Sequence, residues 1–224
     1  MGEKNQGKTK KNDFVEIVYT GYANDTLFDS NKEEDLKKLD PKAKPKKTNI
    51  AIGQGMVVKG FDKELEGKEI GKEYEAEFGP EKGFGERKKE FVRTIPLKAF
   101  TEKNVQPSPG MILNMDNALA KIISVSGGRV VVDFNNPLAG KDIKYKFKIV
   151  RKIEDEKEKC DAVFENLFRI IPKYEIKEKE VVVKDEKGFE GFVNAFKDKF
   201  KELIGKELGF EEVKKEEKDK KTPQ

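Results

Sequence analysis

Apolar and polar residues alternate along the first part of the chain in the way expected of strands with one buried face. In the segment 14–22, Val15, Ile17 and Tyr19 share one face, and a second short strand is predicted at 26–29 after a turn. Side chains of a strand point alternately to its two faces, so the apolar face is expected to lie on a core. The two segments are therefore predicted to pair as a hairpin.

Two more strands and one helix are predicted before residue 80. Residues 48–52 and 72–78 alternate again, and the segment 57–65 between them carries apolar residues at helical spacing. Residues 31–47 are highly charged and contain two prolines, so we predict a long loop there, with room for one helical turn.

Three glycines near the start of the predicted helix raise the question of a nucleotide site. Gly53, Gly55 and Gly60 lack the spacing of a dinucleotide-binding loop, and no Gly-Lys-Ser/Thr follows them. We therefore reject nucleotide binding and interpret Gly53 and Gly55 as a bend.

The pattern changes between residues 88 and 140. Short apolar segments are separated there by Pro-Ser-Pro-Gly, Asp-Asn and Gly-Gly, which are turn signals, so this stretch is predicted to be a small β-rich unit. The segment 143–150 then alternates strongly, and its apolar face suits the sheet begun before residue 80. The β-rich unit is thus predicted to be an insertion in the first domain.

Residues 154–224 form a third segment of mixed character. A helix is predicted at 155–168, a short strand at 180–184, and a helix rich in Phe at 189–205. The charged tail 211–224 is predicted to be disordered.

Composition limits the classes of function. The chain has 224 residues, of which 40% are charged, yet its net charge is only +4 and Lys and Glu are interspersed. A continuous basic stripe of the kind that follows phosphates is missing from the sequence, so nucleic-acid binding is disfavoured. Abundant Lys and Glu without Trp or His resemble the composition of a thermophile.

The rare residue types bear on chemistry and location. Cys160 is the single cysteine and the chain has no His, which argues against a transition-metal site, an internal disulfide and any His-dependent triad. We expect no metal and no cofactor. Residues 1–12 resemble a flexible tail and not a signal peptide, and no apolar run approaches the ~20 residues of a membrane span. A cytoplasmic location without membrane attachment is expected.

Ordered motifs resemble the FKBP family of peptidyl-prolyl isomerases. They are VYTGY with LFDS, IGQGMVVKGFDKELEGKEIGKE, and GFGER with NNPLAGKDIKYKFKIV. The inserted β unit makes the chain similar to the SlyD-like branch, whose insert-in-flap domain binds unfolded chains. The third segment is similar to the extra C-terminal domain of the long archaeal type.

The resemblance implies an α+β fold with three parts. Residues 1–87 and 141–153 would form a strongly bent antiparallel sheet around a short helix, residues 88–140 a small inserted β-rich domain, and residues 154–224 a small α/β domain. We treat dimerisation through this last part as a hypothesis.

The resemblance also implies an aromatic pocket and its residues. Phe61 stands where many relatives have Trp, Phe84 where most have Tyr, and Tyr145 where they have Phe. Ile50 takes a place often held by an aromatic and is expected to contact substrate. The residues that match the catalytic pocket are Tyr19, Phe28, Asp29, Val57, Val58, Phe61, Phe84 and Tyr145.

The implied activity is acceleration of protein folding by rotation of prolyl bonds. The expected partners are unfolded or proline-containing polypeptides, captured by an apolar groove at Met111, Ile112, Leu113 and Met115. Because Phe84 lacks a hydroxyl, macrolide inhibitors are expected to bind weakly. The alternative is a client-binding chaperone whose isomerase pocket is degenerate at Phe84 and Ile50. Nucleic-acid binding is the least favoured hypothesis.

Overall fold

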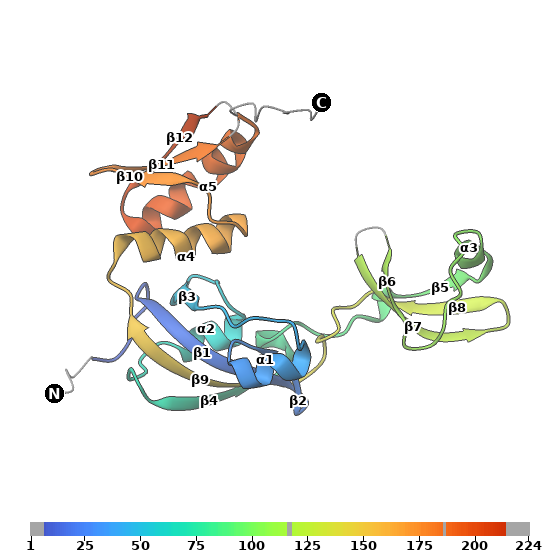
Figure 1. The fold of residues 1–224 in the computed structure, drawn as a ribbon. Helices are drawn as coiled ribbons and strands as arrows, with labels where there is room; N and C mark the ends of the chain where they lie inside the picture. The colour runs from blue at the N-terminus through green and yellow to red at the C-terminus, as the bar shows by residue number, and fades with distance from the viewer. Residues whose placement is uncertain (1–6, 116–117, 186, 214–224) are drawn as a thin grey trace, which may run out of the picture.

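The computed structural model describes residues 7–115, 118–185 and 187–213, and it is an α+β protein with three β-sheets (Figure 1). Each sheet lies beside its own cluster of buried apolar residues. The tails predicted at the two ends of the chain fall partly outside these ranges, at 1–6 and from 214 onward. The prediction of a flexible tail is wrong for residues 7–12, because Thr9 is buried and its hydroxyl donates to the carbonyl of Leu65 at 2.6 Å.

The first sheet gathers strands from both sides of the insertion. Its order is β2-β1-β9-β4, with β3 also paired to β1, and every pairing is antiparallel. The long central strands β1 and β9 have alternating burial because their apolar residues face a single core. The strands are β1 (Phe14–Ala23), β2 (Thr26–Ser30), β3 (Thr48–Ala51), β4 (Glu73–Phe78) and β9 (Ile143–Lys152).

One short helix covers the inner face of this sheet. Helix α2 (Lys59–Glu64) buries Phe61, and the following Leu65 enters the same core. Helix α1 (Glu33–Leu39) lies in the charged segment where one helical turn was predicted, and its seven residues make nearly two turns. Two short 3₁₀ segments, η1 (Pro80–Lys82) and η2 (Lys89–Phe91), follow β4 on the way to the insertion.

The inserted residues form a separate four-stranded antiparallel sheet, drawn in green and yellow-green in Figure 1. Its order is β5-β8-β7-β6, and its core contains Phe100, Ile122 and Val132. Arg87 pairs with Asp133 at 2.7 Å where the chain enters and leaves the sheet. The elements are β5 (Val92–Pro96), α3 (Lys98–Thr101), β6 (Ile112–Met115), β7 (Ala118–Ser126) and β8 (Arg129–Asp133).

The C-terminal unit has a three-stranded sheet of order β10-β11-β12, covered by two helices. Strands β11 and β12 are parallel, because α5 crosses over between them. Strands β10 and β12 are additional to the sequence prediction, and Glu211 and Glu212 belong to β12 and not to a disordered tail. The elements are α4 (Glu156–Phe168), β10 (Tyr174–Ile176), β11 (Glu180–Asp185), η3 (Lys187–Phe189), α5 (Glu190–Ile204) and β12 (Glu207–Glu212).

The core of the C-terminal unit continues onto the edge of the first sheet. Phe14, Ala51 and Ile153 belong to the same buried cluster as Phe164 of α4 and Phe200 of α5. In Figure 1, α4 lies over β3, in agreement with the contacts between these elements. The two units therefore share an apolar junction. Among the helices of the described ranges, none is both long and apolar enough to cross a bilayer.

Candidate active site

A hollow of about 290 Å³ opens between the inner face of the first sheet and the segment that leads into α2. Four of its eight lining residues are aromatic, and one, Asp29, carries a carboxylate. Its lining residues are Tyr19, Asp29, Met56, Val57, Val58, Phe61, Phe84 and Tyr145. Seven of these eight are among the residues predicted from the sequence, so the fold brings together chain segments more than a hundred residues apart.

Two stacked rings form the base of the hollow. Phe61 of α2 and Tyr145 of β9 lie parallel, with ring centroids 4.3 Å apart and an interplanar angle of 6°. Tyr19 meets both rings edge-on at 5.8 Å. Offset-stacked and edge-to-face contacts are the favoured arrangements of aromatic rings, so this base is well packed.

A glycine in β1 makes the room for these rings. Gly21 pairs with Tyr145 across the sheet, and its φ lies outside the positive range that favours glycine. A Cβ at Gly21 would lie 2.9 Å from Tyr145 Cε1 and 3.0 Å from Phe28 Cζ. Any side chain at this position would therefore displace the aromatic wall.

The polar rim consists of a tyrosine and an aspartate from neighbouring strands. The Tyr19 hydroxyl donates to Asp29 Oδ2 at 3.0 Å. Burial, followed by the charge of Asp29, raises the pKa of Tyr19 well above its ordinary range. Burial and then Asp29 raise the pKa of Tyr145 in the same direction. Both phenols therefore stay protonated at neutral pH.

A buried carboxylate that the sequence analysis missed holds the wall of the hollow. Asp62 is buried, and its two oxygens accept the amides of Gly53 and Gly55, each at 2.8 Å. Both glycines have positive φ, which bends the chain toward the carboxylate. Asp is common in the first turn of exposed helices, so the presence of Asp62 in the sequence does not indicate that its carboxylate is buried and binds two backbone amides. Met56 was also missed, although it begins the apolar run that continues through Val57 and Val58.

Two predicted pocket residues lie elsewhere. Phe28 does not line the hollow but supports two rings that do, because its ring lies edge-to-face on Phe84 at 5.6 Å and on Tyr145 at 5.9 Å. Ile50 is only 1% exposed and packs in the core opposite Val15, and it is not among the residues that line the hollow.

The four apolar residues predicted to form a groove on the insertion do not share one face. Met111, Leu113 and Met115 are half-buried against the core of the insertion, whereas Ile112 is 57% exposed on the opposite face of β6. Strand alternation causes this separation. Leu113 and Met115 line a hollow of about 220 Å³.

Ile112 instead shares a different hollow with residues outside the prediction. Leu119 and Ile123 of β7, which are exposed, line it together with Ile112 and Pro137, and its volume is about 340 Å³.

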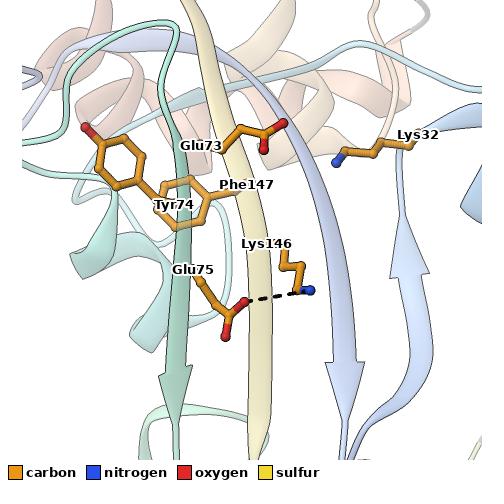
Figure 2. A pocket seen from close by; sticks show the side chains of 6 residues that line it. All are labelled: Lys32, Glu73, Tyr74, Glu75, Lys146 and Phe147. Atoms are coloured by element: carbon orange, nitrogen blue, oxygen red, sulfur yellow. Dashed lines mark ion pairs between the residues drawn. The ribbon is translucent and has the colours of Figure 1, made fainter.

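Another hollow of about 340 Å³ lies on the outer face of the first sheet and differs in character (Figure 2). Figure 2 shows charged side chains from both strands around it, with Glu75 of β4 paired to Lys146 of β9 at 3.8 Å. Lys146 follows Tyr145 and points to the other side of β9, and none of the residues that line this hollow also lines the aromatic one. Exposed ion pairs of this kind are expected on a solvated sheet face.

The described part of the chain offers no candidate metal site. It contains no group of three or more His, Cys, Asp or Glu side chains placed to hold an ion.

The comparisons with known proteins agree with this geometry. Residues 5–102 match the family described as FKBP-type peptidyl-prolyl cis-trans isomerase, and residues 93–138 match the domain described as FKBP26, IF domain. The chain is 32% identical over 143 residues to the short-type peptidyl-prolyl cis-trans isomerase of Methanocaldococcus jannaschii, covering 62% of this chain and 91% of that protein.

Bacterial relatives match over a shorter region. The chain is 31% identical over 102 residues to the FKBP-type peptidyl-prolyl cis-trans isomerase SlyD of Haemophilus influenzae, covering 44% of this chain and 53% of that protein. It is 27% identical over 125 residues to SlyD of Helicobacter pylori, covering 53% and 66%. The matched region therefore spans about half to two thirds of these SlyD proteins.

Proposed function

The chain belongs to the FKBP-type peptidyl-prolyl cis-trans isomerase family and is SlyD-like, and from this we propose that the aromatic hollow is where it rotates the peptide bond before proline. The observation that carries the assignment is the ring of aromatic side chains around one hollow, with the Tyr19–Asp29 pair at its mouth. Its size and apolar walls suit a proline ring.

The physics of the reaction explains why such a site needs no reactive group. Rotation of the bond meets a barrier of ~18–20 kcal/mol because amide resonance is lost. The planar imide is strongly dipolar, and twisting removes part of its charge separation. A dry apolar pocket therefore disfavours the planar state relative to the twisted state. An acceleration of about ten thousandfold needs only ~5.5 kcal/mol of such differential stabilisation.

We assign a role to each part of the hollow. Phe61, Phe84 and Tyr145 pack the proline ring and exclude water, with Phe28 as support. The backbone amide of Val58, which immediately precedes α2, binds a carbonyl of the substrate, since the first amides of a helix lack intrahelical acceptors. Tyr19 and Asp29 orient polar groups of the substrate at the rim.

A peptide assay tests this assignment. Protease-coupled isomerisation of a short proline peptide should be rapid with the full chain and strongly reduced in Asp29→Ala and Phe61→Ala. A matched control is Asp142→Ala, which removes a carboxylate that does not line the hollow. Full activity in both pocket variants would refute the assignment.

The alternative function is a chaperone with a degenerate pocket. It is favoured by the absence of a hydroxyl on Phe84 and by the burial of Ile50, which leaves the hollow without a contact that an aromatic could make in relatives. An inactive full chain in the peptide assay that still suppresses aggregation of an unfolded protein would support this alternative.

We further propose that the inserted domain captures unfolded chains and delivers prolines to the hollow. Its exposed face carries Ile112 and Leu119, which are 57% and 58% exposed, together with Ile123. Exposed large apolar side chains gathered on one sheet face are typical of interaction surfaces.

Removal of the inserted domain tests this second role. Deletion of residues 88–140 should leave peptide isomerisation intact and depress catalysed refolding of a protein whose folding is limited by proline. The double variant Ile112→Thr and Ile123→Thr, which keeps β-branched residues on both strands, should act in the same direction. Unchanged refolding catalysis in both would contradict it.

Dimerisation through residues 154–224 remains a proposal as well. Ile170, Ile171 and Phe192 are all more than half exposed in this unit, which supports an apolar contact. Light scattering of the full chain and of Phe192→Asp would decide: a monomer in both cases would refute it.

A further inference from the structure

The segment that forms one wall of the hollow, residues 53–58, lies between the hollow and the C-terminal unit. We call it the wall segment. Met56, Val57 and Val58 line the hollow, whereas Gln54, in the same segment, contacts helix α5. The same short stretch of chain thus meets the proposed substrate site on one side and the C-terminal unit on the other.

Met56 takes part in two apolar cores at once. Its side chain packs against the core of the first sheet and against the C-terminal core, which contains Phe164 and Phe200. Its sulfur lies 3.2 Å from the backbone nitrogen of Ala51 and accepts its hydrogen. Ala51 itself belongs to the C-terminal core. Because a Met side chain is unbranched and adapts to its surroundings, its position in the hollow depends on how the C-terminal core is packed.

A polar contact adds a second link. Lys199 of α5 donates to Gln54 Oε1, and the Gln54 side-chain amide donates to Asn12 Oδ1. From the inner side Asp62 accepts the amides on either side of Gln54, those of Gly53 and Gly55. The wall segment is therefore fixed by the isomerase domain on one side and by α5 on the other.

From these contacts we propose that Gln54 and Met56 are positioning residues through which the C-terminal unit sets one wall of the prolyl pocket. The proposal rests on the assignment of the hollow as the prolyl site. It gives the C-terminal unit a role in substrate binding. Loss of the Lys199–Gln54 contact loosens the wall segment, and the peptide residues on both sides of the substrate proline are then bound more weakly. The rings that disfavour the planar bond are not part of this link, so the rotation step itself should be preserved.

Single and double variants of the full chain test the link. Lys199→Ala and Gln54→Ala should each raise KM for a proline peptide about two- to fivefold, the range expected for one partly exposed charged contact, with kcat nearly unchanged. The KM effects should be less than additive in the double variant, because each single variant removes the shared Lys199–Gln54 contact along with one of its own, to Glu202 for Lys199 and to Asn12 for Gln54. Lys199→Arg, which keeps a donor on a long cationic side chain, should restore the wild-type KM.

The matched control is Lys201→Ala, which removes a lysine of the same helix that pairs with Glu207 and does not contact the wall segment. Nuclear magnetic resonance gives an independent readout: the backbone amide signals of Val57 and Val58 should shift in Lys199→Ala and stay in place in Lys201→Ala. If Lys199 only stabilised the C-terminal unit, the backbone amide signals of Val57 and Val58 would not shift in Lys199→Ala.

The outcomes separate this proposal from the proposed function. An active wild-type chain in which Lys199→Ala and Gln54→Ala leave KM and the two amide signals unchanged would overturn the proposal. An inactive wild-type chain would refute the proposed function instead, and the amide signals would then decide whether the wall segment is coupled to α5. Additive KM effects in the double variant would also overturn the proposal, because they would show that Lys199 and Gln54 act separately.

Discussion

The Tyr19 hydroxyl donates a hydrogen bond to Asp29 Oδ2 at 3.0 Å, across two strands that pair with a bulge beside the contact. The bulge lies between Gly21 and Tyr22 of β1. Bulges redirect side chains locally, and here the carboxylate and the phenol both reach the rim of one apolar hollow.

Removal of this hydrogen bond should weaken catalysis without unfolding the protein. Tyr19→Phe keeps the ring that meets Phe61 and Tyr145, and it loses a bond to a charged acceptor, which is typically worth ~1.5 kcal/mol. We expect kcat/KM for a proline peptide to fall about tenfold. Tyr74→Phe is the matched control, because its hydroxyl accepts from the Glu69 amide away from the hollow. An equal loss in both variants would contradict a role at the rim.

Isomerisation should be nearly independent of pH between about pH 6 and 9. The chain has no His, and burial together with Asp29 raises the pKa of Tyr19 and of Tyr145, so neither phenol ionises in this range. A bell-shaped kcat/KM profile with a limb in this window would show that an ionising group takes part in the reaction.

Stability should instead fall in alkaline solution. Because folding raises the pKa of these phenols, their contribution to stability is complete below the pKa of the unfolded chain, about 10. It is lost as the pH rises above that value. Burial acts in the same direction on Cys160, raising its pKa to about 12 from 9.0. Unfolding in urea followed from pH 7 to 11 should show this decline, and constant stability to pH 11 would contradict it.

The stacked ring of Phe61 should carry a large part of the stability of the isomerase domain. Phe61 is 1% exposed, and Phe61→Ala is expected to cost about 3–5 kcal/mol because it leaves a cavity under Tyr145. Phe192→Ala removes the same side chain where it is 58% exposed and should cost far less. The free energy of unfolding in denaturant checks both, and a similar cost at the two positions would be inconsistent with the packing described.

Asp62 should stabilise the wall segment more than its place on a short helix suggests. Asp62→Ala leaves the amides of Gly53 and Gly55 without their acceptor, and each lost bond to a charged group is worth about 1.5–3 kcal/mol. We expect a loss of stability of this order together with a raised KM, measured by denaturant unfolding and by the peptide assay. Asp29→Ala, whose carboxylate lies at the open rim, should change activity with little change in stability.

A hydroxyl added at residue 84 should strengthen macrolide binding. Phe84 lines the hollow, and its ring is held edge-on by Phe28. Phe84→Tyr supplies a donor at the rim, and one additional hydrogen bond is worth about 0.5–1.5 kcal/mol, so affinity should rise roughly two- to tenfold. Calorimetric titration with a macrolide checks this. Phe84→Leu should bind more weakly than the wild type, and unchanged affinity in both variants would place the macrolide elsewhere.

Local sequence pattern and motif order predict the long strands and most of the residues that line the hollow. Alternation over the segments that became β1, β4 and β9 fixes which side chains face the core, because a strand has only two faces. The resemblance of ordered motifs then identified seven of the eight residues that line the hollow.

Packing between elements sets the features that local pattern leaves open. Ile50 and Phe84 are both apolar residues beside turns, but the pairing of β3 with β1 buries the first, whereas the second stays at the hollow. Strand β12 is short and half polar, and it is specified by a parallel partner reached only through α5.

The roles of Met56 and Asp62 also could not be predicted from local sequence pattern. Each depends on neighbours brought together by folding: the C-terminal core beside Met56, and the two bent glycine amides around Asp62. Residue type and spacing carry the periodicity of an element, whereas a contact between elements depends on their packing in three dimensions. For this reason the sequence predicted the hollow, and only the fold revealed what holds its wall in place.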